Sequence, residues 1–203
     1  MTKLKLLLGV VAVCTLTVSH AQDASIKGTP YMNDTYEEGV IFLEKNKFKV
    51  PARYNAFKDL MEYQQGGRAM VLDPSPAVKR IRLQNATFVV EKFVLDGKPK
   101  FGYLMLLDSG KAMLYSRKVV NYVPPKKGGN LDGTDQLAEF RKVPDIFYVK
   151  IGNAELHEVR NMKSLLAGFP DKQEELTRFA KKEKISPRKE DEVVKLVKYY
   201  NSL

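Results

Sequence analysis

The segment LMEYQQGGRAMVL, residues 60–72, carries the clearest folding signal in the sequence. Its paired glycines, residues 66–67, supply the positive φ angles that a two-residue hairpin loop requires. Pairing the chain around that loop places alternate side chains on one face of an antiparallel pair, as a half-buried sheet requires. The side chains predicted to share this face are Met61, Tyr63, Met70 and Leu72. Core periodicity therefore explains this concentration of tyrosine and methionine better than a binding site does.

The same pairing around residues 45–46 and residues 109–110 predicts two more hairpins. Their predicted cross-strand pairs are Leu43 with Phe48, Ile41 with Val50, Leu106 with Met113, and Leu104 with Tyr115. Further strand-like runs cover residues 79–83, 87–95, 117–123 and 146–151. The hairpin side chains that we expect to be largely buried are Met61, Tyr63, Met70, Leu72, Leu104, Leu106, Met113 and Tyr115.

The period of apolar residues changes from that of strands to that of helices after Gly152. Asn161 is the predicted N-cap of a helix over residues 162–168, and a second helix is predicted over residues 170–184. Residues 186–187, Ser-Pro, predict the start of a third helix. The apolar stripe of that helix consists of Val193, Leu196, Val197 and Tyr200.

These patterns predict an α+β fold, in which an antiparallel β-meander is followed by a C-terminal helical segment that packs on it. We expect the meander to form a curved sheet or half-barrel. The β-rich domain is predicted over residues 22–152, with an exposed loop at about residues 124–144, and the helices over residues 153–203.

The N-terminus has the three parts of a secretory signal peptide. Two lysines precede an apolar stretch that is too short to span a membrane, and Ser19 and Ala21 fit a cleavage site before Gln22. Lipidation of Cys14 is the alternative, but the bulky Val13 before it disfavours that processing. We therefore expect an exported protein, periplasmic or associated with the outer envelope, with residues 1–21 removed.

The side-chain inventory limits the possible chemistry. After cleavage at Ala21 the chain has no cysteine and one histidine, His157. This excludes cysteine nucleophiles and any zinc site with two or more His or Cys ligands, and HEVRN at residues 157–161 lacks the second histidine of a zincin. A histidine-dependent hydrolase would have to use His157, while a pair of catalytic carboxylates is left open. We expect no catalytic residue, no cofactor and no metal.

The charge balance indicates the class of partner. The chain carries a formal net charge of +10, with the basic excess before Pro144. An exported protein seldom meets nucleic acid, so a protein of the envelope, an anionic polymer or anionic lipid headgroups are the expected partners. The candidate binding residues are Lys79, Arg80 and Arg82, although strand alternation sends Lys79 and Arg80 to opposite faces.

Several phrases of the sequence also point to a family. GTPYMNDTYEEGVIF, RYNAFKDLMEY, VLDPSPAVKRI, FPDKQEELTRFAKKEKI and LVKYYNSL together extend over nearly the whole mature chain. In these phrases the chain resembles a family of uncharacterised secreted β-rich proteins common in Bacteroidota. The resemblance implies export and supplies no chemistry and no catalytic residue.

The sequence leaves two function hypotheses. The first is a secreted non-enzymatic envelope protein, whose basic β-sheet surface binds a protein partner or an anionic surface polymer. The second is a periplasmic carrier of a small molecule or lipid, with an apolar interior lined by tyrosine and methionine.

The cleavage site yields a direct prediction. Because Ser19 and Ala21 form the best-fitting cleavage site, N-terminal sequencing of exported protein should begin at Gln22. Recovery of a lipid-modified Cys14 at the N-terminus would contradict this expectation.

Overall fold

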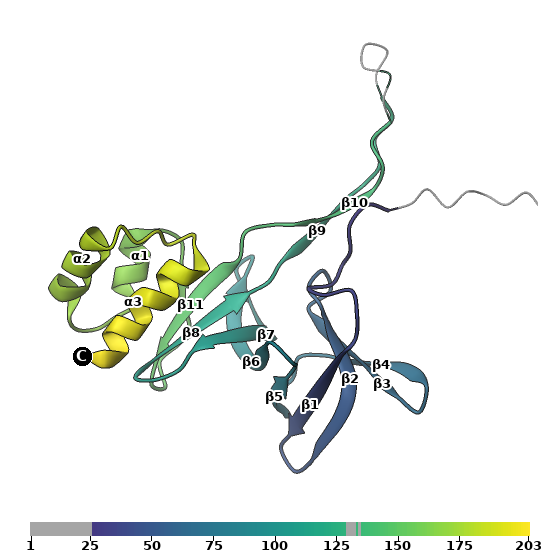
Figure 1. Cartoon of the computed structure of the whole chain (residues 1–203), viewed down its shortest axis with the longest axis horizontal. Helices are drawn as coiled ribbons and strands as arrows, with labels where there is room; N and C mark the ends of the chain where they lie inside the picture. Colours follow the sequence, from purple (N-terminus) through teal and green to yellow (C-terminus); the bar gives the residue numbers. More distant parts are fainter. Residues whose placement is uncertain (1–25, 129–132, 134) are drawn as a thin grey trace, which may run out of the picture.

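One large antiparallel sheet with three helices at its end dominates the fold (Figure 1). The structure, a computed structural model, describes residues 26–128, 133 and 135–203, so the predicted signal peptide lies outside the described residues. Ten strands pair in the order β12-β11-β8-β7-β6-β5-β1-β2-β3-β4, and β9 pairs with β10 separately. The strands are β1 (Glu37–Leu43), β2 (Lys47–Asn55), β3 (Leu60–Gln65), β4 (Arg68–Leu72), β5 (Val78–Arg82), β6 (Thr87–Leu95), β7 (Lys98–Asp108), β8 (Ala112–Arg117), β9 (Val120–Val123), β10 (Glu139–Lys142), β11 (Ile146–Ile151) and β12 (His157–Val159). The predicted α+β class and β-meander are confirmed.

The chain order of the sheet departs from simple succession twice, where β5 pairs with β1 and where β11 pairs with β8. Strands β1 to β4 follow one another, but β5 then returns to the free side of β1 instead of extending the sheet beyond β4. The chain continues from β5 through β6, β7 and β8, and β11 and β12 complete the sheet. This return places β1 between β2 and β5, in the middle of the N-terminal half.

The predicted hairpin around residues 66–67 is confirmed in every pair, including Tyr63 with Met70. In the other two hairpins the predicted register is wrong by two residues, since Ile41 pairs with Phe48 and Leu106 pairs with Tyr115. The β1–β2 turn closes one residue earlier than predicted, and β7 contains a bulge after Leu106. A shift of two residues keeps each side chain on its predicted face, because side chains alternate with a period of two.

The expected burial of the hairpin side chains is only partly confirmed. Met61, Leu104 and Tyr115 are buried, whereas Tyr63, Leu72, Leu106 and Met113 are half-buried. Met70 is 43% exposed, and that prediction was wrong. The reason is its position on β4, the last strand of the sheet, in a hairpin that projects from the rest of the sheet (Figure 1).

The segment predicted as an exposed loop, residues 124–144, contains a strand. β10 pairs with β9 to form a two-stranded arm that extends away from the large sheet (Figure 1). The run predicted as one strand over residues 117–123 is divided, since Arg117 ends β8 and β9 begins at Val120.

The helices are α1 (Met162–Ala167), α2 (Gln173–Lys182) and α3 (Glu190–Ser202). Asn161 caps α1 as predicted, accepting a hydrogen bond from the Ser164 backbone. The predicted start of the third helix was wrong, because Lys189 rather than Ser186 precedes its first turn. The predicted stripe of α3 is confirmed, with all four side chains fully buried against the sheet.

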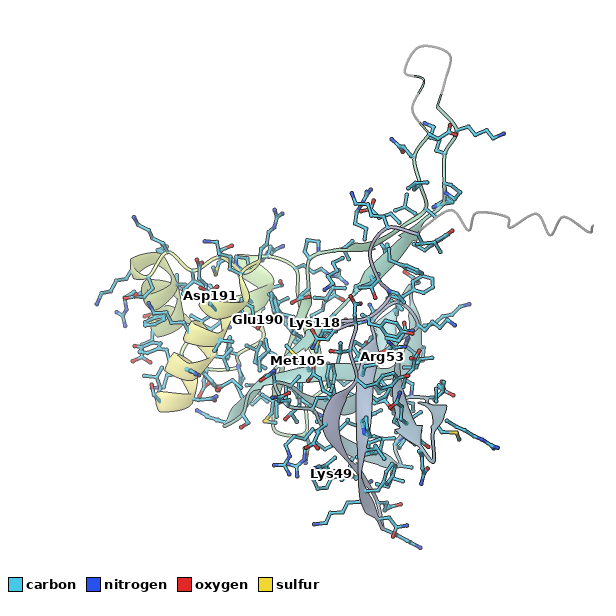
Figure 2. All side chains as sticks on the ribbon, turned by 45° about the vertical axis from the view of Figure 1, so that its right-hand side comes forward. Lys49, Arg53, Met105, Lys118, Glu190 and Asp191 are labelled. Atoms are coloured by element: carbon cyan, nitrogen blue, oxygen red, sulfur yellow. The ribbon has the colours of Figure 1, made fainter. Side chains whose placement is uncertain are left out.

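An ion-pair group joins the start of α3 to the sheet. Lys118, just after β8, contacts Asp145 and lies 2.8 Å from Glu190 in the first turn of α3 (Figure 2). Burial would lower the pKa of Lys118, but hydrogen bonds to the two carboxylates outweigh it and raise the pKa. The ammonium group therefore stays charged and helps to orient α3 against β7 and β8.

The N-terminal half of the sheet curls so that β2 faces β6 and β7. The ring of Tyr54 on β2 lies 4.8 Å from that of Phe88 on β6, measured between centroids. The connection from β2 to β3 carries Asp59, whose carboxylate accepts hydrogen bonds from the Tyr54 hydroxyl (2.9 Å) and the Tyr103 backbone N–H (3.1 Å). Lys100 on β7 lies 2.9 Å from the other carboxylate oxygen. Asp59 thus holds the curled sheet against β7.

We expect Asp59→Ala to lower the free energy of unfolding by about 1–3 kcal/mol, because it leaves the buried Tyr103 N–H and Tyr54 hydroxyl unpaired. Asp59→Asn is the matched control, since asparagine tolerates the positive φ of 55° and retains one acceptor oxygen. Urea denaturation measures both variants. An alanine variant as stable as the asparagine variant would show that the acceptor oxygen at this position does not hold the sheet.

Candidate functional site

The outer face of β1, β2 and β5 gathers exposed cations. Inward side chains such as Ile41 and Ile81 are fully buried, so the residues that alternate with them point outward. Toward the β1–β2 turn, the outward side chains are Lys47 and Lys49 on β2, Val40 and Phe42 on β1, and Arg80 and Arg82 on β5, with Glu38 next to them on β1. We call these six residues, without Glu38, the basic face.

The pairing register sets the geometry of the basic face. Phe42 lies between Lys47 and Arg80, and Val40 lies between Lys49 and Arg82. Neighbouring strands are about 4.8 Å apart and successive residues about 3.3 Å, so the four cations start from the corners of a rectangle of about 10 by 7 Å. The strands hold these positions, while the side chains extend into solvent.

Phe42 organises the two arginines of the basic face. The guanidinium carbons of Arg80 and Arg82 lie 4.6 and 5.6 Å from the centre of the Phe42 ring. These cation–π contacts orient the guanidinium groups while their N–H donors stay available. Within the described part of the chain, no carboxylate lies within ion-pair distance of Arg80, Arg82 or Lys47, while Lys49 pairs with Glu38 at 2.7 Å.

The structure brings together two of the three predicted binding residues. Arg80 and Arg82 both belong to the basic face, whereas Lys79 lies at the irregularity in the β1–β5 pairing, 3.5 Å from Glu44. Sequence reasoning missed Lys47 and Lys49. Their alternation with Phe48 and Val50 was visible, but the pairing of β5 with β1 that joins them to the arginines was not.

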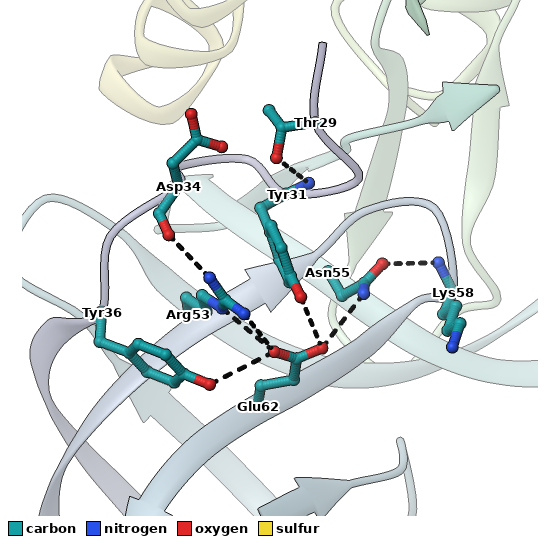
Figure 3. Close-up of polar contacts among 8 residues, drawn as sticks. All are labelled: Thr29, Tyr31, Asp34, Tyr36, Arg53, Asn55, Lys58 and Glu62. Atoms are coloured by element: carbon teal, nitrogen blue, oxygen red, sulfur yellow. Dashed lines mark hydrogen bonds and ion pairs between the residues drawn. The ribbon is translucent and has the colours of Figure 1, made fainter. Parts of the chain in front are cut away.

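The far end of the same face of β2 is closed by an internal ion pair. Arg53 donates from Nε and Nη2 to Glu62 on β3, at 3.0 and 2.9 Å (Figure 3). Its guanidinium carbon lies 3.5 Å from the centre of the Tyr31 ring and 4.3 Å from that of Tyr36. Figure 2 places Lys49 toward the β1–β2 turn and Arg53 farther along the strand.

Glu62 is the centre of this closed end. It also accepts hydrogen bonds from the hydroxyls of Tyr31 (3.1 Å) and Tyr36 (3.4 Å) and from the Asn55 amide (3.3 Å). Burial alone would raise the pKa of Glu62, but the hydrogen bonds from Arg53, Asn55 and Tyr31 outweigh it and lower the pKa. The charge of Arg53 is therefore compensated within the protein, unlike the charges of Arg80 and Arg82.

Three further features considered from the sequence are His157, a possible metal site and a possible membrane-spanning segment. His157 on β12 is half-buried, and its Nε2 lies 2.8 Å from the backbone oxygen of Ser164. Over residues 26–128, 133 and 135–203, no three His, Cys, Asp or Glu side chains are grouped so that they could hold a metal ion. None of the helices described is long and apolar enough to cross a membrane.

Comparison with protein-family models, with curated proteins and with solved structures finds no significant match.

The ion pair between Arg53 and Glu62 should make a pH-dependent contribution to the stability of the fold. The lowered pKa of Glu62 means that its contribution is complete above the ordinary value of 4.5 and is lost as the pH falls through the lowered pKa. We expect Glu62→Gln to reduce the free energy of unfolding by about 1.5–3 kcal/mol near pH 7, and by much less at acid pH. Chemical denaturation across this pH range measures the difference.

The matched control is Glu38→Gln, which removes an exposed carboxylate whose pair with Lys49 is fully hydrated on both sides. That variant should differ little from the wild type at any pH. A Glu62→Gln effect of the same size at pH 3 and pH 7 would contradict the role assigned to the Glu62 charge.

Proposed function

We propose that this protein is an exported, non-enzymatic envelope protein whose basic face binds an anionic surface polymer. The observation that carries the proposal is the pair Arg80 and Arg82, held on the Phe42 ring with no carboxylate partner among the described residues. Lys47 and Lys49 complete the set on β2, on the other side of β1.

The arrangement suits a ligand with repeated negative charges. Cations that are fixed on β2 and β5, on either side of β1, can contact successive anionic groups of an extended polymer without first ordering a flexible loop. Guanidinium groups bind carboxylate, sulfate or phosphate oxygens in a bidentate manner, and lysines add positive charge that is less directional. Because all these groups are exposed, the interaction should weaken as salt screens it.

The packing of the sheet favours this outer site over a carrier with an apolar interior. Tyr54, Phe88 and Tyr103, which the carrier hypothesis would place around a ligand, are almost fully buried and pack on one another. Tyr103 also donates from its hydroxyl to the backbone oxygen of Leu72 at 3.1 Å. These contacts are those of a filled core.

The test is charge reversal on the basic face. We expect the double variant Arg80→Glu and Arg82→Glu to bind dextran sulfate and polygalacturonate at least tenfold more weakly than the wild type, by isothermal titration calorimetry in low salt. The wild-type affinity should itself fall with added salt. Unchanged affinity in the double variant would overturn the proposal.

The matched control reverses Arg178 and Arg188, two exposed arginines of the helical region that belong to no ion pair among the described residues. This variant has the same net charge as the first, so equal weakening by both would indicate a response to overall charge and not a site. Turnover of either polymer that is lost in His157→Ala would instead indicate a hydrolase.

A further inference from the structure

A groove lies at the other end of the sheet, on the face opposite the helices. On β11, Phe147 and Val149 pack with the helices, so Tyr148 between them points to the groove side. Two cavities of about 320 and 520 Å³ lie here, between the end of the β6–β7 hairpin and the β11–β12 connection. Both are lined by Phe93, Val94 and Leu156, and they therefore form one continuous groove.

The middle of the groove is apolar. The rings of Phe93 on β6 and Tyr148 on β11 lie 5.7 Å apart between centroids, although β7 and β8 separate the two strands in the sheet. Phe93 crosses β7 at Gly102, where a Cβ atom would lie only 2.6 Å from the ring, so glycine is required for this approach. Ile146, Leu95 and Leu156 extend the apolar lining.

Each end of the groove has a self-contained ion pair. Lys150 contacts Glu91 at 2.8 Å, and Arg160 contacts Glu158 at 2.9 Å. The other charged residues of the lining are Lys92 and Glu155 at one end and Asp96 at the other, and none of these three has an ion-pair partner among the described residues. The apolar chain of a ligand is therefore expected in the middle of the groove, away from the acidic groups at its ends.

Arg117 lies behind the apolar middle, against Phe93, and is not itself part of the lining of the two cavities. It ends β8 directly beside Ile146, and its guanidinium carbon lies 5.3 Å from the centre of the Phe93 ring. Its Nε is buried without a hydrogen-bond partner, and within the described residues no carboxylate lies within ion-pair distance of it. Burial raises the pKa of Tyr148, and the nearby charge of Arg117 acts in the opposite direction. A half-buried cation without a counter-charge is unfavourable until an anion pairs with it.

We propose that this groove binds a single-chain anionic amphiphile, with its apolar chain along Phe93, Tyr148 and Leu156 and its acidic group at Arg117. The volumes of the two cavities fall within the range of small-molecule sites, and such sites combine an apolar lining with a few polar groups. The occupant differs from the proposed polymer, and the groove shares no residue with the basic face. The two proposals can therefore fail independently.

The experiment titrates the ¹⁵N-labelled protein with sodium decanoate and, separately, with 1-decanol, which has the same chain without the charge. Decanoate should shift the amide signals of Phe93, Tyr148 and Leu156, and should bind at least tenfold more tightly than decanol. No shift at these residues up to the solubility limit, or decanol binding as tightly as decanoate, would overturn the proposal.

Two variants separate the contribution of the charge from that of the fold. Arg117→Met keeps an unbranched side chain while removing the charge, and it should weaken decanoate binding at least tenfold while changing decanol binding less than twofold. Arg188→Met, an exposed arginine near the helices, should change neither affinity. If thermal melts show that Arg117→Met does not fold, Leu156→Glu on the half-exposed rim should abolish decanoate binding; retained binding there would also overturn the proposal.

Discussion

The carboxylate of Asp59 is the contact on which the shape of the N-terminal half depends. A ten-stranded sheet without it would be free to flatten, but Asp59 fastens the β2–β3 connection to the middle of β7 through a phenol, a backbone N–H and an ammonium group. Its positive φ aims the side chain back toward β7, and aspartate is one of the few residues that tolerates this conformation. Burial and the Asp59 carboxylate both raise the pKa of Tyr54, so the phenol remains a donor. Because the sheet is held curled, the faces of β1, β2 and β5 that point away from the core are exposed to solvent.

The curled sheet also explains how one face carries two different surfaces. In the basic face, on β1, β2 and β5, four of the six outward side chains are exposed cations. Farther along, β6 and β11 approach each other across β7 and β8, and the outward side chains there become an apolar groove with Phe93 and Tyr148 at its centre. The helices cover the opposite face, where Leu114, Phe147 and Val149 pack against α3 and its neighbours. The basic face and the groove therefore lie on one face of one sheet, and the curvature of the sheet separates them.

The positions of the acidic residues decide which cationic side chains are available to bind a ligand. Arg53 and Lys49 project from the same face of β2, yet Glu62 and two tyrosine rings enclose Arg53 while Lys49 remains in solvent. Arg117 shows the opposite case, since it is half-buried but has no carboxylate partner among the described residues. An arginine is therefore a candidate for ligand binding because of what surrounds it, and its position in a strand is not sufficient.

The sequence by itself determined the elements and their faces. Glycines at residues 66–67 specified one hairpin pair by pair, and the stripe from Val193 to Tyr200 specified the buried side of α3, because turn geometry and side-chain period are local properties. Arg80 and Arg82 could likewise be assigned to one face of a strand. Only the tertiary structure decided that β5 pairs with β1, that Asp59 reaches β7 and that Phe93 meets Tyr148. These contacts join residues that are distant in the chain, and local periodicity carries no information about which strands become neighbours.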